Sequence, residues 1–303
     1  MLTAVIGTVF VDIKGFPDGK FIPAGRNSGR IERVHGGVAR NVAEDVRALG
    51  GDCLFVSLVD ESGEASEVLA RLEKRGIDTR YVGRTPDGMG TWLAVFDEHG
   101  DVFAAISRRP VLAPIVGILE EKGDEIFSAA DSILFEIDVD PEIDEKVFEL
   151  AEKYGKKVYG VVSNISIAAE TPEIFSHLDC FTCNELEAGI LFGEKFDGSD
   201  PDAAAQTLSR CIGRLGLPRM VVTLGENGSV WADADGERGY CPAEKIKMVD
   251  STGAGDAFFS GLSVGLTLGK SIGDSCRIGT RLAASVITEQ RNVCTEDMRT
   301  LLD

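Results

Sequence analysis

The chain has 303 residues, 44% of them hydrophobic and 27% charged, and 50 acidic against 31 basic residues give a formal net charge of −19. This length suffices for a substantial core in one large or two smaller domains, and the negative balance argues against a surface that neutralises nucleic-acid phosphates or anionic lipid. No apolar run is long enough to span a bilayer, the first residues carry no basic segment typical of a signal peptide, and the seven scattered cysteines are typical of reduced thiols. We therefore expect a cytoplasmic protein without a nucleic-acid or membrane partner.

The first quarter of the chain alternates strand and helix patterns. Residues 2–10 form a β-rich apolar run that predicts a buried strand, and apolar residues at helical spacing over 38–49 predict a helix that ends at a diglycine. A second strand over 53–59 is followed by a helical pattern over 68–75. Between the first strand and the first helix, residues 12–33 are rich in Gly, Pro, Lys, Arg and Asn and offer little core material.

Two β patterns, 91–96 and 102–106, flank the turn sequence D-E-H-G-D and predict a hairpin. Helical patterns then alternate with further strand candidates at 132–137, 157–162, 180–182 and 220–224. The end of the chain, from residue 271, has a helical pattern. Strands separated by helices predict βαβ units in a mostly parallel sheet. The segments 12–33 and 90–107 interrupt this alternation and predict a small β appendage.

Residues 248–261 have the sequence M-V-D-S-T-G-A-G-D-A-F-F-S-G and predict a strand that leads into a Gly-rich turn at a helix N-terminus. The unpaired backbone N–H groups of such a turn and the helix dipole can hold a phosphate, and Gly253 and Gly255 permit its close approach. Asp256 lies in the first helical turn, where the dipole favours the charged form. We expect it to be ionised at neutral pH and able to accept a proton from a hydroxyl during phosphoryl transfer. A plain helix N-terminal acid beside a tight turn explains this stretch equally well.

Two other patterns fail the requirements of the sites they suggest. Residues 265–271, G-L-T-L-G-K-S, have three residues between the glycines where a P-loop needs four, and they follow a helix instead of a strand. Cys180 and Cys183 form a lone C-x-x-C in a chain with three histidines. Buried strand cysteines are therefore a better interpretation than a zinc site.

The stretch H-G-G-V-A-R-N, residues 35–41, places a diglycine before a helix and Asn41 one turn into it. Gly36 and Gly37 could let a ligand approach the backbone, and Asn41 could bind sugar hydroxyls; a plain loop with an exposed Asn is the alternative. Arg40 is expected to be a solvated helix residue. Asp12 follows a buried strand at the edge where α/β sheets bind ligands, although Asp is also a common turn residue.

Polar residues also follow two later strands. Asn184 and Glu187, in N-E-L-E, open a helix after the strand at 180–182. They can cap that helix, and acids at this edge of a parallel sheet can also hold Mg²⁺ through water. Thr223, Gly225 and Gly228 form a Gly-rich turn after the strand at 220–224, which suits a hairpin or a nucleotide contact.

These segments, in this order, resemble the ribokinase or phosphofructokinase-B-type (PfkB) family of carbohydrate and nucleoside kinases over nearly the whole chain. The resemblance rests on five patterns, G-x-x-x-x-D (7–12), G-G-x-x-x-N-x-A (36–43), N-x-x-E (184–187), T-x-G (223–225) and D-x-T-G-A-G-D (250–256). It implies a single domain over 1–303 with the ribokinase-like fold, a three-layer α/β sandwich around a mostly parallel sheet. It also implies a small β lid formed by 12–33 and 90–107, through which many members dimerise.

The resemblance further implies a role for each matching residue in ATP-dependent phosphorylation of a small-molecule sugar or nucleoside. The catalytic base would be Asp256, beside an anion hole formed by Gly253, Ala254 and Gly255. The acceptor sugar would be bound by Asp12, Gly36, Gly37 and Asn41. The nucleotide and Mg²⁺ would be bound by Asn184, Glu187, Thr223, Gly225 and Gly228, with Glu187 acting on Mg²⁺ through water. Many members also bind K⁺, which would lie near Asp250, Thr252 and Asn292.

The acceptor is less constrained. G-G-V-A-R-N-V-A-E (36–44) and G-E-R-G-Y (236–240) are more similar to pseudouridine kinases than to ribokinases, although Ala39 stands where those enzymes usually have Gly. We therefore predict formation of pseudouridine 5′-phosphate, with ribose, another nucleoside or a hexose phosphate as alternatives. A regulatory protein that binds nucleotide or sugar without turnover would be marked by loss of Asp256 or the Gly-rich turn, and both are present.

Overall fold

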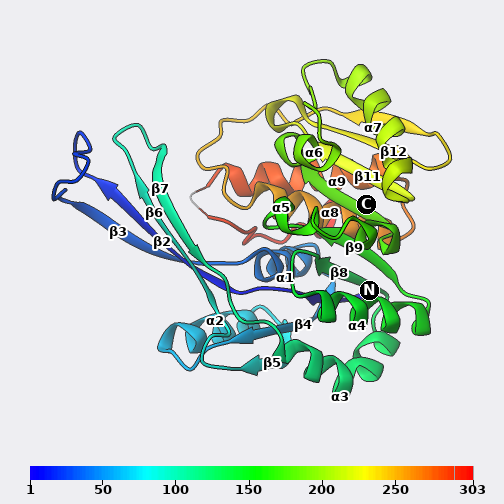
Figure 1. The fold of residues 1–303 in the computed structure, drawn as a ribbon, viewed down its shortest axis with the longest axis horizontal. Helices are drawn as coiled ribbons and strands as arrows, with labels where there is room; N and C mark the ends of the chain where they lie inside the picture. The colour runs from blue at the N-terminus through cyan, green and yellow to red at the C-terminus, as the bar shows by residue number, and fades with distance from the viewer. Residues whose placement is uncertain (290, 303) are drawn as a thin grey trace.

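A nine-stranded sheet forms the centre of the computed structural model, which describes residues 1–289 and 291–302 (Figure 1). Its strands lie in the order β13 (Arg238–Cys241), β12 (Ser229–Asp233), β11 (Arg219–Thr223), β10 (Cys180–Asn184), β9 (Lys157–Val161), β8 (Ser132–Glu136), β1 (Leu2–Ile6), β4 (Asp52–Val59) and β5 (Asp78–Arg84). Neighbouring strands from β11 to β5 are parallel, and β12 and β13 continue the sheet as antiparallel strands. The predicted mostly parallel α/β sheet is confirmed.

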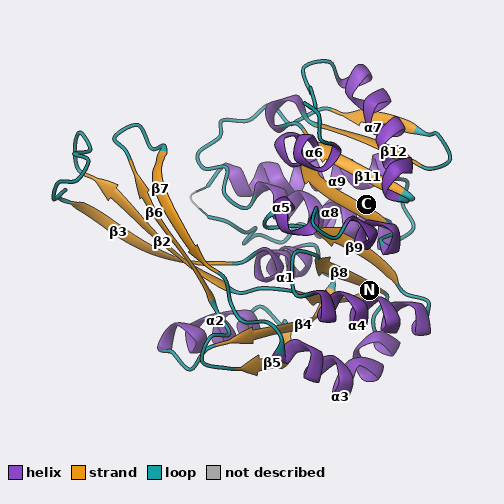
Figure 2. Ribbon diagram, viewed as in Figure 1, coloured by secondary structure: helices purple, strands orange, loops and turns teal. Residues whose placement is uncertain are grey.

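Helices cover both faces of this sheet (Figure 2). One apolar cluster includes α1 (Val38–Ala48), α2 (Gly63–Lys74), α8 (Ala254–Thr267) and α9 (Ile272–Ile287). The other includes α3 (Pro114–Ala129), α4 (Pro141–Tyr154), α5 (Ile165–Ala168), α6 (Glu185–Phe192) and α7 (Pro201–Leu215). Successive residues of β1 face opposite clusters, Ala4 and Ile6 one and Val5 the other, because strand side chains alternate. The result is three layers.

Local sequence fixes several helix ends. α4 begins with Pro141 and ends at Gly155 in the left-handed conformation, the positions where these residues are most favourable. Asp200 caps α7 by accepting hydrogen bonds from two backbone N–H groups of its first turn. None of these helices within the described part of the chain is long and apolar enough to cross a membrane.

A second, four-stranded sheet projects from the body (Figure 1). Its order is β3 (Gly29–Gly36), β2 (Phe10–Pro17), β6 (Gly90–Phe96) and β7 (Val102–Arg108). The outer pairs are antiparallel, and β2 and β6 are parallel. The segments 12–33 and 90–107, expected to form an appendage, supply most of these strands. We call this the small sheet.

Several elements differ from the sequence prediction. The strand expected over 2–10 ends at Ile6, because the backbone N–H of Thr8 donates to the Glu136 carboxylate at 2.8 Å instead of continuing the ladder, and Phe10 already begins β2. Asp12 therefore lies within the small sheet. The edge strands β5 and β13 and the neighbouring strand β12 were not predicted, and the C-terminal helical pattern stops at Ile287.

The strand expected before the Gly-rich turn is also absent. Among the described residues, those between Cys241 and Gly253 form no strand. The backbone N–H of Val249 instead donates to the carbonyl of Ile287 at 2.8 Å, so that this segment is attached to the end of α9 rather than to a sheet.

The helix that begins at the Gly-rich turn, α8, packs tightly against α9. A Cβ at Gly261 would lie 2.6 Å from the Cα of Gly279, and a Cβ at Gly279 would lie 2.5 Å from the carbonyl oxygen of Phe258. Both contacts are with backbone, which cannot move aside without shifting a helix. Glycine at these positions therefore sets the separation of the two helices.

Gly279→Ala is expected to destabilise the protein by about 1–3 kcal/mol, because the added methyl group forces α8 and α9 apart. Gly213→Ala is the matched control, since Gly213 lies within α7 with open space around it and alanine favours helix by about 0.5–1 kcal/mol. Urea unfolding followed by circular dichroism measures both. A Gly279→Ala midpoint equal to or above that of the parent would contradict this account of the helix contact.

Candidate active site

A cavity of about 480 Å³ opens where the small sheet meets the body. Asp12 lines it from β2, Gly37 and Asn41 from the start of α1, and Asp256 from the first turn of α8. The structure thus brings together four residues that the sequence places up to 244 positions apart. Trp92 of β6 and Arg109, just beyond β7, complete the wall on the side of the small sheet.

The diglycine makes room for this cavity. A Cβ at Gly36 would lie 2.7 Å from both carboxylate oxygens of Asp12, so any side chain there would displace the acid. Gly37 has φ of 98°, a conformation that favours glycine, and a Cβ on it would lie 2.5 Å from the carbonyl oxygen of Thr8. Burial raises the pKa of Asp12 above its ordinary value.

Asp256 is held by a direct hydrogen bond from Asn41. The Asn41 Nδ2 donates to Asp256 Oδ2 at 2.6 Å, which joins the first turns of α1 and α8. Gly253, with φ of 81°, is the N-cap of α8, and Ala254 and Gly255 are its first residues. Asp256 therefore stands beside the exposed N–H groups of a helix N-terminus, the arrangement expected for an acid next to an anion site.

Asp256 was expected to be ionised at neutral pH, and its surroundings lower the ionised fraction there. Loss of hydration raises the pKa of its carboxyl to about 7, and the charges of Asp12 and Glu187 act in the same direction. The hydrogen bond from Asn41 and the charge of Arg40 lower this pKa, but burial outweighs them. A group with a pKa near 7 is well suited to accept a proton near neutral pH, and its charged fraction rises as pH passes through this value.

A second cavity, of about 810 Å³, lies along α6 and the end of β11. Asn184, Thr223 and Gly225, which were expected to contact a nucleotide, line this cavity together. Glu187 is bound to Asn184 in a capping box: the Asn184 N–H donates to Glu187 Oε2 at 2.8 Å, and the Glu187 N–H donates to Asn184 Oδ1 at 2.9 Å. Burial raises the pKa of Glu187.

Gly228 has a different setting from the one expected. It does not line the second cavity, and a Cβ on it would lie 2.1 Å from the carbonyl oxygen of Cys241. Its φ of 90° and the pairing of β11 with β12 show that the turn closes a hairpin. The hairpin interpretation of this turn is confirmed.

The residues expected near K⁺ lie on two adjacent segments. Asp250 Oδ1 accepts hydrogen bonds from the N–H of Thr252 at 2.9 Å and from its hydroxyl at 2.7 Å. A Cβ at Gly253 would lie 2.1 Å from the carbonyl oxygen of Asn292, so the loop after α9 packs directly on the Gly-rich turn.

Two buried acids near the cavity were missed. Glu136, at the end of β8, accepts hydrogen bonds from the N–H and hydroxyl of Thr8, and burial with the nearby charge of Asp138 raises its pKa to about 7. Asp138 accepts from the N–H and hydroxyl of Ser163 at 2.8 and 2.6 Å and pairs with Arg109. The available signal was an E-x-D sequence at the carboxyl end of a predicted central strand, where α/β sheets bind ligands.

Arg40 also differs from expectation. It is fully buried instead of solvated, and its guanidinium pairs with Glu44 at 2.7 Å. By contrast, Cys180 and Cys183 are buried free thiols, as predicted.

A helix N-terminus with an adjacent acid, at the mouth of a cavity on a covered parallel sheet, is an arrangement that suits phosphoryl transfer to a hydroxyl. The sequence model of the pfkB family of carbohydrate kinases matches residues 2–297, and the chain belongs to this family.

Relatives of known activity include nucleoside and sugar kinases. The chain is 31% identical to guanosine-inosine kinase of Exiguobacterium acetylicum over 97% of both chains. It is 24% identical to pseudouridine kinase of Escherichia coli (strain K12) over 86% of this chain and 82% of the relative. Arabidopsis thaliana ribokinase complexed with ribose and ATP has a similar fold, with 20% identity, a TM-score of 0.83 and coverage of 100% of this chain and 98% of that one. The ribokinase-like fold is confirmed, and the protein is an ATP-dependent sugar or nucleoside kinase.

Asp256→Asn is expected to lower kcat by roughly two to four orders of magnitude, because the amide keeps the shape of the side chain but cannot accept the proton. Initial rates of ADP release and the urea midpoint measure activity and folding. Asp274→Asn is the matched control, since Asp274 lies in the first turn of α9 on the surface. Asp256→Asn activity within tenfold of the parent would reduce Asp256 to an ordinary helix N-terminal acid.

Proposed function

We propose that this kinase transfers the γ-phosphoryl group of ATP to the 5′-hydroxyl of a nucleoside, with Asp256 as the catalytic base. The observation that supports this most is the cavity in which Asp12, Asn41 and Asp256 converge beside the N-terminus of α8. Polar side chains that converge on one small cavity suit a ligand with several hydroxyls. The Gly-rich turn would supply the anion hole next to it.

The geometry suggests a simple division of roles. Asp12 and Asn41 would hold the ribose hydroxyls and so direct the 5′-hydroxyl toward Asp256. As the hydroxyl oxygen bonds to the γ-phosphorus, the bond from phosphorus to the ADP oxygen breaks and the hydroxyl proton passes to Asp256. The N–H groups of Gly253, Ala254 and Gly255 would stabilise the charge on the moving phosphoryl oxygens. The small sheet would exclude water from this step.

Guanosine or inosine is the acceptor that we propose first. The relative that phosphorylates them, by its name, matches 97% of this chain at 31% identity, against 86% at 24% for the pseudouridine kinase. Trp92 in the wall of the cavity offers an aromatic surface to a base. Pseudouridine is the second candidate, supported by the sequences at 36–44 and 236–240.

The second cavity would bind ATP through Asn184, Thr223 and Gly225. In residues 1–289 and 291–302 no group of three or more His, Cys, Asp or Glu could hold a metal ion directly. Mg²⁺ would therefore be bound mainly by nucleotide phosphates and water. Glu187 could contact it through water, because the capping box leaves lone pairs free on the Glu187 carboxylate. Magnesium would neutralise phosphate charge. K⁺ would lie beside Asp250, Thr252 and the carbonyl group of Asn292.

An acceptor comparison tests the substrate proposal. Guanosine and inosine are expected to give kcat/KM at least about tenfold above pseudouridine, uridine, adenosine and ribose, which corresponds to about 1.4 kcal/mol of differential transition-state binding. ADP release is measured with each acceptor, with and without K⁺. Ribose ranking above all nucleosides would refute the nucleoside assignment and leave the kinase assignment standing.

We also propose a homodimer formed through the small sheet. Strand pairing places Ile31, Leu93 and Ile106 on one face, because Leu93 pairs with Ile106 and with Ile13, and Ile31 pairs with Gly15 two residues further along β2. Asp12 and Trp92 lie on the opposite face and line the cavity. Ile31 is 75% exposed and Ile106 70% exposed. A second copy of the same face would cover this apolar surface.

Ile106→Glu is expected to convert the dimer to a monomer, because a charge on the apolar face would be buried without a partner. Light scattering after size exclusion gives the mass. Ile246→Glu, at a 40% exposed residue after β13, is the control and should leave the mass unchanged. A parent protein that is monomeric at tens of micromolar, or an Ile106→Glu dimer, would disprove this interface.

A further inference from the structure

Asn292, on the loop after α9, is a buried residue that contacts Asn41 in the wall of the cavity. It is 6% exposed, and its amide nitrogen donates two hydrogen bonds. One goes to the carbonyl oxygen of His35 at 2.7 Å, and the other goes to Oδ1 of Asn41 at 3.3 Å. Asn292 therefore contacts the residue that in turn donates to Asp256.

These bonds have a fixed direction. A backbone carbonyl can only accept, so the His35 oxygen requires the nitrogen, and not the oxygen, of the Asn292 amide on its side. The same nitrogen then meets Oδ1 of Asn41. With its oxygen engaged in this way, Asn41 presents its own nitrogen to Asp256, where it donates at 2.6 Å. A free Asn41 amide could turn over and present its oxygen instead.

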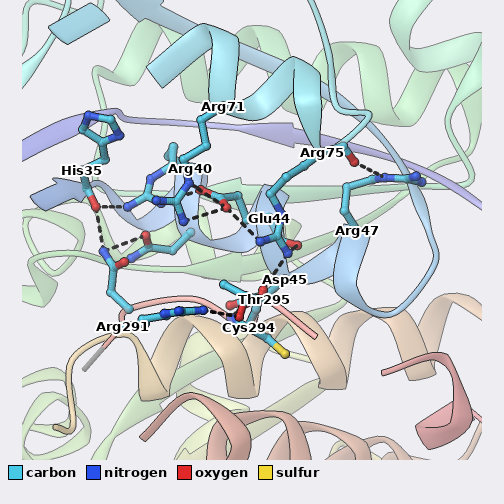
Figure 3. A network of polar contacts seen from close by, with 12 residues as sticks. His35, Arg40, Glu44, Asp45, Arg47, Arg71, Arg75, Arg291, Cys294 and Thr295 are labelled. Atoms are coloured by element: carbon cyan, nitrogen blue, oxygen red, sulfur yellow. Dashed lines mark hydrogen bonds and ion pairs between the residues drawn. The ribbon is translucent and has the colours of Figure 1, made fainter. Parts of the chain in front are cut away.

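The loop that carries Asn292 is attached to α1 and α2 by buried groups (Figure 3). The N–H of Cys294 donates to Asp45 Oδ1 at 2.7 Å, and Arg75 donates to the Cys294 carbonyl oxygen at 2.6 Å. Arg75 also pairs with Glu44 at 3.3 Å. Loss of hydration raises the pKa of Asp45 well above its ordinary value.

The His35 carbonyl is fixed by the same group of residues. Arg40 donates to it and pairs with Glu44, and both side chains are fully buried. Arg71 makes a further ion pair with Glu44 at 2.9 Å. Figure 3 shows Glu44 between these arginines. Buried charges held on several sides leave the His35 oxygen and the Asn292 loop little freedom to move.

We propose that Asn292 is a positioning residue for the catalytic base: it holds the amide of Asn41 so that an N–H group, and not an oxygen, faces Asp256. This inference rests on the proposed role of Asp256, and it assigns Asn292 a function apart from any bound ion. Its effect passes through Asn41, whose amide contacts Asn292 with its oxygen and Asp256 with its nitrogen.

The consequence for Asp256 can be derived from the groups around it. Asp12 and Glu187 disfavour its charged form, while Arg40 and the Asn41 hydrogen bond favour it, and burial brings its pKa to about 7. Without Asn292, Asn41 is free to turn over when Asp256 is protonated, and its oxygen then accepts a hydrogen bond from the carboxyl O–H. This bond stabilises the neutral form, so the pKa of Asp256 rises and the base is protonated over a wider pH range.

The test compares Asn292→Ala and Asn292→Leu with the parent. Leucine fills the space of asparagine without an N–H group, so it separates hydrogen bonding from packing. The acid limb of kcat/KM should lie near pH 7 in the parent and about one unit higher in both variants, giving about a tenfold loss at pH 6.5 and recovery above pH 9. Arg291→Ala is the control, since Arg291 lies on the same loop and donates to Thr295 at 2.6 Å, away from Asn41.

A second measurement does not depend on turnover. Carboxyl ¹³C resonances of labelled aspartates are titrated by NMR, and Asp256→Asn identifies the Asp256 signal by its disappearance. The Asp256 pKa should rise in both Asn292 variants and stay unchanged in Arg291→Ala. An unshifted Asp256 titration, or a loss of activity that is equal at all pH values, would overturn the positioning role. A parent inactive on every acceptor, with the NMR shift present, would count against the proposed function alone.

Discussion

The hydrogen bond between Asn41 and Asp256 joins two helices whose contacting residues are 215 positions apart in sequence. Each helix follows a glycine with positive φ, Gly37 before α1 and Gly253 before α8. The backbone therefore turns sharply into each helix, and the first turn of each helix faces the cavity. The contact requires α1 and α8 to lie on the same face of the main sheet, within one apolar cluster. The cavity lined by Asn41 and Asp256 exists only because that packing holds.

Burial of charge determines how this site behaves. In a chain with net charge −19, further acids near the cavity raise the proton affinity of Asp256 and Glu136. The buried charge of Arg40 opposes this effect and lowers the pKa of Asp256. It does so more strongly than a solvated arginine would, because a charge acts more strongly where water is excluded. Glu44 is what allows Arg40 to be buried, since an unpaired guanidinium there would cost several kcal/mol.

The sequence predicted the centre of the fold better than its edges, for a physical reason. Central strands such as β4 and β8 are buried on both faces and form continuous apolar runs, whereas the short, largely exposed edge strand β13 follows a weaker pattern and was not predicted. The glycines and polar residues of short motifs, such as those at 36–41 and 250–256, could also be located from the sequence. The burial of Arg40, the pKa of Asp256 and the role of the acids after β8 depend on contacts between distant segments, which periodicity does not contain.

The division of the cavity between two sheets bears on specificity. Asn41 and Asp256 belong to the body, while Asp12 and Trp92 belong to the small sheet. A bound acceptor would therefore connect the two parts, and its binding energy would contribute to holding the small sheet over the reacting atoms. Residues of β6 and β7 can change the shape of the cavity without altering the Asn41–Asp256 contact.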